Sequence, residues 1–532
     1  MTSKGNIGRT AILVVIAIAC GIVSGLLMVV AMTPAGWWPL IFVGLVPMVF
    51  AQYRLLPRVW CWIPVSVTAL VYVGGGYSYQ FVDSARPYFF LAPIVVAIIF
   101  APLAVMDRAL SERSSFKLFV LQMPVMWTGL DALRQNLSLS GTTGDIVYSL
   151  TREARLIEPV SVFGIFGLEL LILAINYGLA LLVLHAVSWD KLGGLVPLRK
   201  VVAWSVSVVV VAAVAWGVSG AALYNSVQAS SGTTIRVAAV QPGSAYANDN
   251  ADTLPTAVQE AGFEAQLSLM TERAARLGAK LVVWPEEYLP FNPATGPAAD
   301  RAWLTGLVEK THVYVVTGFV GPLSSQAEDW VPYSYRNQAA LIGPNGTVLG
   351  IYTKQHQAPF DDDLFATGSA SPSYPTSIGT IGVEICYDFA FQGPTRVEAL
   401  GGANILAIPS WQGSSDVNIP NWDRLVFDAV ENRVPAVNAD QAWMSIIVKA
   451  NGQIVSFVDD PSSSGRTALL VGDVQLGPRN SPFLTLGNWI GDLAIFGTVG
   501  LVAFGLIAIF SDRRKARPRA TRYASNEASS AT

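Results

Sequence analysis

The sequence has few charged residues for its length. Of 532 residues, 13% are charged and 52% are hydrophobic, and the mean hydropathy is positive. Soluble proteins usually carry about 25% charged residues, so this deficit excludes an ordinary soluble protein and indicates large surfaces in contact with lipid. The apolar content also excludes disorder over most of the chain. A net charge of −3 offers no basic footprint for nucleic acid.

Histidine and cysteine are also scarce, with three of each. His312 and His356 have no second ligand at zinc spacing, so we expect neither a metal nor a cofactor. Cys20 and Cys61 fall in hydrophobic runs, which leaves Cys386 as the one cysteine outside them. A single cysteine excludes an internal disulfide in that part of the chain.

The charges that are present are unevenly distributed. Residues 234–486 hold 14 Lys and Arg against 25 Asp and Glu, a net charge of −11, and the rest hold 20 against 12, a net charge of +8. We therefore predict an N-terminal membrane domain over 1–233 and an acidic domain over 234–486. A further membrane span over 487–511 and a basic, disordered tail over 512–532 would follow.

Eight hydrophobic stretches approach the roughly 20 residues that a membrane-spanning helix needs. They are Thr10–Met32, Trp37–Ala51, Trp60–Tyr79, Tyr88–Met106, Phe116–Leu133, Val160–Leu184, Val201–Leu223 and Trp489–Phe510. With eight spans, the loops rich in Lys and Arg and the tail from Arg513 fall on one side. The positive-inside rule then predicts cytoplasmic termini and an extracytoplasmic acidic domain.

Two acidic residues, Asp131 and Glu169, lie inside these hydrophobic stretches. Ionisable groups within membrane spans are functional candidates by default. The alternative is that each lies near an interface or pairs locally, for example Asp131 with Arg134. We favour local pairing.

The acidic domain alternates short apolar strands with helix-like stretches, which predicts an α/β layered fold. Helices are expected near 254–277, 301–310 and 421–432. Strands are expected at 234–242, 280–286, 313–318, 337–343, 348–352, 380–385 and 404–408.

Three reactive side chains lie at the ends of predicted strands, at or just beyond an apolar run: Glu286, Lys354 and Cys386. Ligand groups gather at the carboxyl ends of strands in α/β folds. A carboxylate can remove the thiol proton, and an amine can stabilise the oxyanion formed when the thiolate attacks an acyl group. The set therefore favours acyl transfer, although Cys386 on its own could equally be a buried structural cysteine.

These residues and their neighbours resemble the nitrilase, or carbon–nitrogen hydrolase, superfamily. The resemblance rests on Trp284-Pro-Glu286, on Lys354 with Pro359-Phe360, and on Ile385-Cys-Tyr387. It implies an αββα sandwich with Glu286, Lys354 and Cys386 as the catalytic triad. The whole chain resembles the apolipoprotein N-acyltransferase family, whose fifth-span motif is similar to residues 124–134 and whose next motif is similar to residues 158–168.

The family resemblance implies a two-step reaction in a bacterial cell membrane. Cys386 would take a fatty acyl chain from a phospholipid as a thioester, and the N-terminal amine of a diacylglyceryl-cysteine lipoprotein would then accept it. Asp362, Tyr387 and Asp388 are expected to support the triad. The family usually has Glu in place of Asp388 and Gly-Glu after the Pro-Phe pair, so shorter acids here could weaken positioned contacts.

Two other functions stay open at this point. The first is a membrane-anchored amidase or hydrolase that passes its acyl group to water. The second is a low-activity paralogue that scaffolds a cytoplasmic polyprenol-phosphate mannose synthase, with the basic tail from Arg513 as its docking segment.

Overall fold

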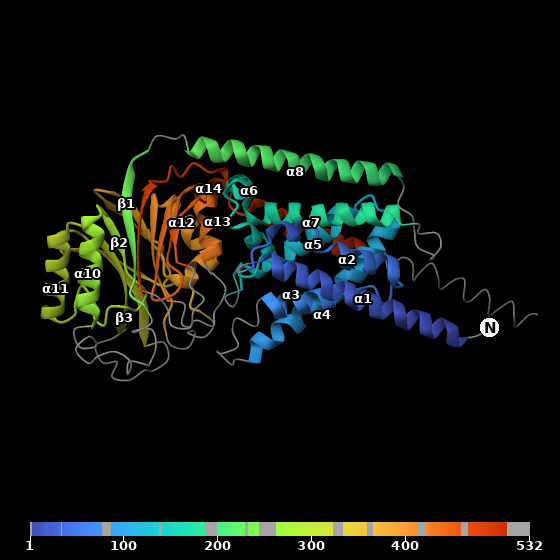
Figure 1. Cartoon of the computed structure of the whole chain (residues 1–532), viewed down its shortest axis with the longest axis horizontal. Coiled ribbons are helices and arrows are strands. Elements are labelled where there is room, and N and C mark those ends of the chain that lie inside the picture. Colours follow the sequence, from blue (N-terminus) through green and yellow to red (C-terminus); the bar gives the residue numbers. More distant parts are fainter. Residues whose placement is uncertain are drawn as a thin grey trace, which may run out of the picture.

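The computed structural model describes residues 3–32, 35–76, 87–137, 141–187, 199–228, 232–243, 262–322, 334–358, 365–411, 422–458 and 467–507. The molecule is elongated, with a helical bundle at one end and an α/β domain at the other (Figure 1). Asp362 and the tail from Arg513 lie outside the described residues. The helical bundle and layered α/β domain predicted from the sequence are both present.

The bundle is built from apolar helices. They are α1 (Ser3–Ala31), η1 (Trp38–Phe42), α2 (Val46–Phe50), η2 (Ala51–Leu55), α3 (Trp62–Gly76), α4 (Pro87–Arg113), α5 (Phe119–Arg134), η4 (Ile146–Leu150), α6 (Ala154–Ile157), α7 (Val160–Ala186), α8 (Arg199–Gln228) and the C-terminal helix Trp489–Ile507. Bulky apolar side chains point outwards, as Val211 on α8 does with 67% of its surface exposed. Such surfaces suit contact with lipid tails.

Each of the eight predicted stretches is largely helical, but their lengths differ. Within the described residues, six helical segments are long and apolar enough to cross a membrane, counting Trp38–Leu55 as one. The other two are α3, with 15 residues, and α5, with 16. Eight spans is therefore an approximate count, because these two helices are shorter than a full crossing requires.

The α/β domain is a sandwich of two six-stranded sheets. The first sheet has the order β12 (Ala468–Gln475), β1 (Thr234–Gln241), β2 (Leu281–Val283), β3 (Tyr314–Pro322), β4 (Tyr335–Ile342), β5 (Val348–Thr353). The second has the order β11 (Ile454–Phe457), β10 (Ile446–Val448), β9 (Ala436–Asp440), β8 (Ile405–Ser410), β7 (Gly379–Val383), β6 (Ser373–Thr376). Each sheet has a parallel centre flanked by antiparallel strands.

Helices cover the outer face of each sheet, which completes the αββα layering (Figure 1). They are α10 (Gly262–Arg276) and α11 (Ala298–Thr311) on the first sheet, α12 (Gln392–Leu400) and α13 (Trp422–Asn432) on the second, and the short α14 (Pro482–Leu486). Apolar residues of α13 pack into one continuous core with the membrane bundle, as the 5.4 Å contact between the Phe427 and Tyr148 rings illustrates. The second sheet therefore faces the bundle.

Candidate active site

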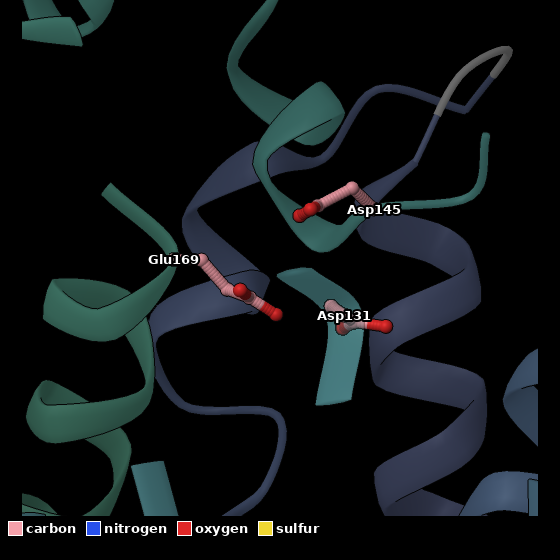
Figure 2. Close-up of side chains that lie close together, drawn as sticks. All are labelled: Asp131, Asp145 and Glu169. Carbon is pink, nitrogen blue, oxygen red and sulfur yellow. The ribbon is translucent and has the colours of Figure 1, made fainter. Parts of the chain in front are cut away.

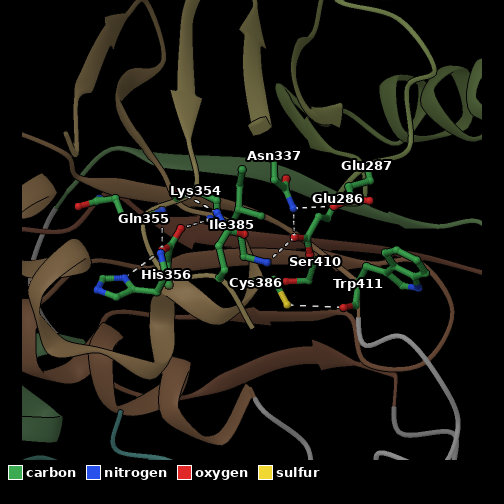
Figure 3. A network of polar contacts seen from close by, with 12 residues as sticks. Glu286, Glu287, Asn337, Lys354, Gln355, His356, Ile385, Cys386, Ser410 and Trp411 are labelled. Atoms are coloured by element: carbon green, nitrogen blue, oxygen red, sulfur yellow. Dashed lines mark hydrogen bonds and ion pairs between the residues drawn. The ribbon is translucent and has the colours of Figure 1, made fainter. Parts of the chain in front are cut away.

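The three strand-end residues predicted from the sequence meet inside the sandwich (Figure 3). In the first sheet β2 is parallel to β3, and β4 is antiparallel to both β3 and β5. The carboxyl ends of β2 and β5 thus reach the same edge, which places Glu286 beside Lys354. Cys386 follows β7 of the facing sheet, so the thiol approaches from the opposite layer.

Glu286 and Lys354 form a buried ion pair. Lys354 Nζ donates to Glu286 Oε1 at 2.7 Å, and Asn337 Nδ2 donates to the same oxygen at 2.7 Å. Only 2% of Glu286 and 1% of Lys354 is exposed. The second carboxylate oxygen, Oε2, is buried and accepts no hydrogen bond from any described residue. One oxygen is therefore held in place while the other is available to take a proton.

Backbone contacts fix the position of this pair. Gln441 Nε2 donates to the Glu286 carbonyl oxygen at 2.9 Å, and the Lys354 N–H donates to the Asn337 carbonyl at 2.9 Å. If β2 continued, the side chain of Glu287 would lie on the face opposite that of Glu286. Glu287 instead has a left-handed backbone, and its carboxylate also accepts a hydrogen bond from Asn337 Nδ2. Because β2 ends at Val283, the side chains of the residues after it need not alternate between the two faces of the sheet.

Cys386 is the first residue of the 3-10 turn η7 (Cys386–Ala390) and has a left-handed backbone with φ of 42°. Its Sγ lies 3.6 Å from the Trp411 carbonyl oxygen, to which the thiol donates. Burial raises the pKa of this thiol well above its ordinary value, the negative charge of Glu286 raises it further, and Lys354 opposes the shift. The resting side chain is thus a neutral thiol that needs a base.

Asp388 anchors the segment after β5 to the turn that carries the thiol. It accepts from the Tyr352 hydroxyl at 2.7 Å and from the backbone N–H groups of Gln355 and His356 at 3.1 and 2.8 Å. Asp388, although shorter than the Glu that the family usually has here, therefore accepts hydrogen bonds from three donors. Tyr387 packs edge-on against Phe391 and lines the cavity described next.

A cavity of about 870 Å³ joins the thiol to the interior of the helical bundle. Its wall is mostly apolar and includes Val65 on α3, Ile99 on α4 and Trp127 on α5, together with Cys386 and Tyr387. Apolar pockets of this size suit hydrophobic ligands. The cavity thus connects the thiol with apolar space among the bundle helices.

The two intramembrane acids lie at the edge of this cavity. Asp131 pairs with Arg134 at 2.9 Å, as favoured from the sequence, and also accepts from Trp127 Nε1 at 2.9 Å. Asp131 and Arg134 both line the cavity. Glu169 is fully buried and lies close to Asp131 and Asp145 (Figure 2).

Several contributors to the site were not identified from the sequence. Asn337 lies inside β4, Gln441 follows β9, and the Trp411 carbonyl belongs to a residue just after β8. Polar side chains in otherwise apolar strands are the signal that could have identified Asn337, because buried polar groups are normally hydrogen-bonded. A backbone carbonyl leaves no such signal.

Comparison with known proteins gives two family matches. The profile described as Carbon-nitrogen hydrolase matches residues 236–478, and the one described as Apolipoprotein N-acyltransferase N-terminal domain matches residues 24–178. An apolipoprotein N-acyltransferase of Geobacter metallireducens is 25% identical, covering 93% of this chain and 95% of that protein. One of Rhodopseudomonas palustris is 24% identical, covering 86% and 90%. A solved amidase structure from Nesterenkonia is 21% identical with a TM-score of 0.37, covering 48% and 95%.

Proposed function

Because the chain belongs to the apolipoprotein N-acyltransferase family, we propose that it transfers a fatty acyl chain from a phospholipid to the N-terminal amine of diacylglyceryl-cysteine in lipoproteins. The observation that carries this proposal is the single cavity that runs from the bundle helices to Cys386. Both substrates are lipids, and such a cavity lets each reach the thiol without leaving the membrane.

In the first step Glu286 takes the proton from Cys386 Sγ, and the thiolate attacks the ester carbonyl carbon of the phospholipid. A C–S bond forms, and the carbonyl oxygen becomes an oxyanion that Lys354 Nζ stabilises. The C–O bond to the glycerol backbone then breaks. The departing alkoxide takes the proton back from Glu286, so the products are a thioester on Cys386 and a lysophospholipid.

In the second step the lipoprotein amine attacks the thioester carbonyl carbon. A C–N bond forms, Glu286 accepts a proton from the amine, and the C–S bond breaks. That proton returns to the Cys386 thiolate, which restores the neutral thiol. Supporting this assignment, Glu286 keeps one oxygen without a hydrogen bond from the described residues while the other is held by Lys354 and Asn337.

Asp388 and Tyr387 are positioning residues in this proposal. Asp388 holds the turn at Cys386 against β5, through the Tyr352 hydroxyl, and against the segment after Lys354, through the His356 N–H. Tyr387 forms part of the cavity wall next to the thiol. Asp362, the third expected supporting residue, lies outside the described residues.

The multi-pass bundle supports placement in a bacterial inner membrane with the α/β domain on the extracytoplasmic side. The basic residues of the alternate loops and of the tail from Arg513 support this orientation. A polyprenol-phosphate mannose synthase that docks on the tail stays a prediction for the cytoplasmic side.

Trapping of the acyl intermediate tests the proposed function. The full chain in detergent is incubated with a phospholipid labelled in its acyl chains, and protein-bound label is followed. We expect label that hydroxylamine removes, as a thioester requires, and that the Cys386→Ala variant does not acquire. Folded wild-type protein that acquires no label, or label that persists in Cys386→Ala, would contradict the proposal.

A further inference from the structure

Three carboxylates from separate segments of the bundle face one another. They are Asp131 on α5, Asp145 just before η4, and Glu169 on α7 (Figure 2). One oxygen from each lies within 4.8 Å of the other two. Asp145 is 1% exposed and Glu169 is 0% exposed, so the repulsion among these groups is screened little by water.

Glu169 points towards Asp131 (Figure 2), so the polar group that its carboxylate meets is another carboxylate. Neither of its carboxylate oxygens accepts a hydrogen bond from a described residue. Asp107, an equally buried acid on α4, differs: it accepts from the Tyr53 hydroxyl at 2.7 Å and from the Gln52 and Gln122 side-chain amides. A buried carboxylate normally has such donors, so a buried Glu169 that meets other carboxylates and no described donor calls for a cationic ligand.

The charge and spacing of the cluster identify the ligand. Arg134 contacts Asp131 and donates to the Thr143 carbonyl at 2.7 Å, which brings one positive charge to the group. In the ion-bound state all three carboxylates would be ionised, and against one guanidinium they would carry two net negative charges, which one divalent cation would neutralise. Calcium binds oxygen ligands at about 2.3–2.6 Å. Oxygens that lie within 4.8 Å of one another can therefore all contact one such ion.

We propose that Asp131, Asp145 and Glu169 bind a hard divalent cation, with calcium as the favoured ion. The ion would link α5, the segment before η4 and α7. Carboxylate oxygens are the ligands that such ions prefer. The proposal concerns ion binding itself and does not depend on the proposed acyl transfer.

The proposed ion site is connected to the turn that carries Cys386. The Thr142 N–H and hydroxyl both donate at 2.9 Å to the carbonyl of Ala390, the last residue of the turn that begins at Cys386. Thr143 and Gly144 line the cavity. An ion on Asp145 would therefore fix the segment that connects the bundle to the turn carrying the thiol.

Terbium luminescence tests the site directly. Terbium(III) replaces calcium at oxygen sites, and its emission is sensitised by a nearby indole. Trp127 Nε1 donates to Asp131 Oδ2 at 2.9 Å, so it would be the sensitiser. With chelator-treated full chain in detergent, we expect terbium emission on tryptophan excitation, displacement by calcium, and loss of the emission in Trp127→Phe.

Glu169→Gln is the decisive variant and Asp107→Asn its matched control, since both change one buried acid of the bundle. We expect Glu169→Gln to weaken terbium binding by at least about tenfold, because loss of even an outer-shell partner can cost that much. Asp107→Asn should retain the wild-type affinity. Calcium should raise the Tm of wild type and Asp107→Asn but not of Glu169→Gln. Absence of emission from folded wild type, or unchanged affinity in Glu169→Gln, would overturn the proposal.

Discussion

Glu286 and Lys354 lie almost out of contact with water, and their burial determines what each can do at Cys386. Two donors converge on Glu286 Oε1, from Lys354 and from Asn337. The same burial raises the pKa of the Cys386 thiol, so the nucleophile stays protonated until a base acts. In the proposed mechanism, Glu286 acts as base because its second oxygen accepts no hydrogen bond from the described residues, and Lys354 stabilises the oxyanion.

Replacement of the base should slow formation of the acyl-enzyme. Glu286→Gln keeps the shape of the side chain but cannot take the thiol proton, and general-base catalysis typically contributes about a hundredfold to ten-thousandfold in rate. We expect the initial rate of labelling at Cys386 to fall within that range. Glu287→Gln is the matched control, because Glu287 accepts from the same Asn337 amide. A similar loss in both variants would contradict the assignment of Glu286 as base.

The reactivity of the thiol should depend on pH in a defined direction. A raised pKa means less thiolate at a given pH, so alkylation of Cys386 by iodoacetamide should be slow at pH 7. Its rate should climb only above about pH 8.5, the ordinary thiol pKa. Because the charge of Glu286 is one cause of the shift, Glu286→Gln should move the alkylation profile to lower pH even as acylation slows. A profile centred below the ordinary thiol pKa would contradict this.

Residue types at strand ends were the part of the site that the sequence could predict. Glu286, Lys354 and Cys386 each follow an apolar run, and the structure brings all three together. The Trp411 carbonyl was not predictable, because backbone atoms carry no sequence signature. Glu287 could be placed only after it was known that β2 stops at Val283.

At the scale of elements, the length of a helix or strand decided whether it could be predicted from the sequence. The predicted bounds of long apolar helices such as α8 lie within a few residues of those observed. The predicted strands that lead to Glu286, Lys354 and Cys386 are also present. The strands β6 and β9 to β12 were not predicted. β10 and β11 have three and four residues, too few for a clear periodicity, and their place in the sheet depends on long-range pairing.

The contact between α5 and the C-terminal helix is close enough to need a glycine. A methyl group on Gly129 would lie 2.2 Å from Thr498 Oγ1 and 2.6 Å from the Ala494 carbonyl oxygen. We expect Gly129→Ala to destabilise the protein by about 1–3 kcal/mol through overpacking, measured as a lower Tm in detergent. Gly500→Ala is the control, since a methyl group there meets nothing within 4 Å. Equal Tm values for the two variants would show that this contact is not close-packed.

At the scale of the whole molecule, the bundle and the sandwich share one core. Phe427 and Val430 of α13 cluster with Tyr148 and Ile157 of the bundle. Polar contacts also cross the junction, since Arg433 pairs with Glu158 and the Ile165 N–H donates to Glu431 at 2.9 Å. One face of the α/β domain is therefore packed against the membrane bundle.

The shared core predicts that residues 234–486 do not form a stable soluble domain on their own. Without the bundle, the apolar face of α13 and the buried Arg433 would meet water, and large exposed apolar patches favour aggregation. We expect this fragment to aggregate when expressed alone and to become monodisperse when co-expressed with residues 1–233, as size-exclusion chromatography would report. A soluble, cooperatively unfolding fragment would show that the junction is dispensable.

Acyl transfer through Cys386 is the central claim, and the fate of a preformed thioester tests it most directly. The enzyme is first loaded with labelled acyl chain, freed of donor, and then mixed with a diacylated lipopeptide or with buffer. We predict that label moves to the peptide amine as a hydroxylamine-resistant amide, much faster than free fatty acid forms in buffer. Release of free fatty acid at the same rate with and without the lipopeptide would contradict the account and indicate a hydrolase.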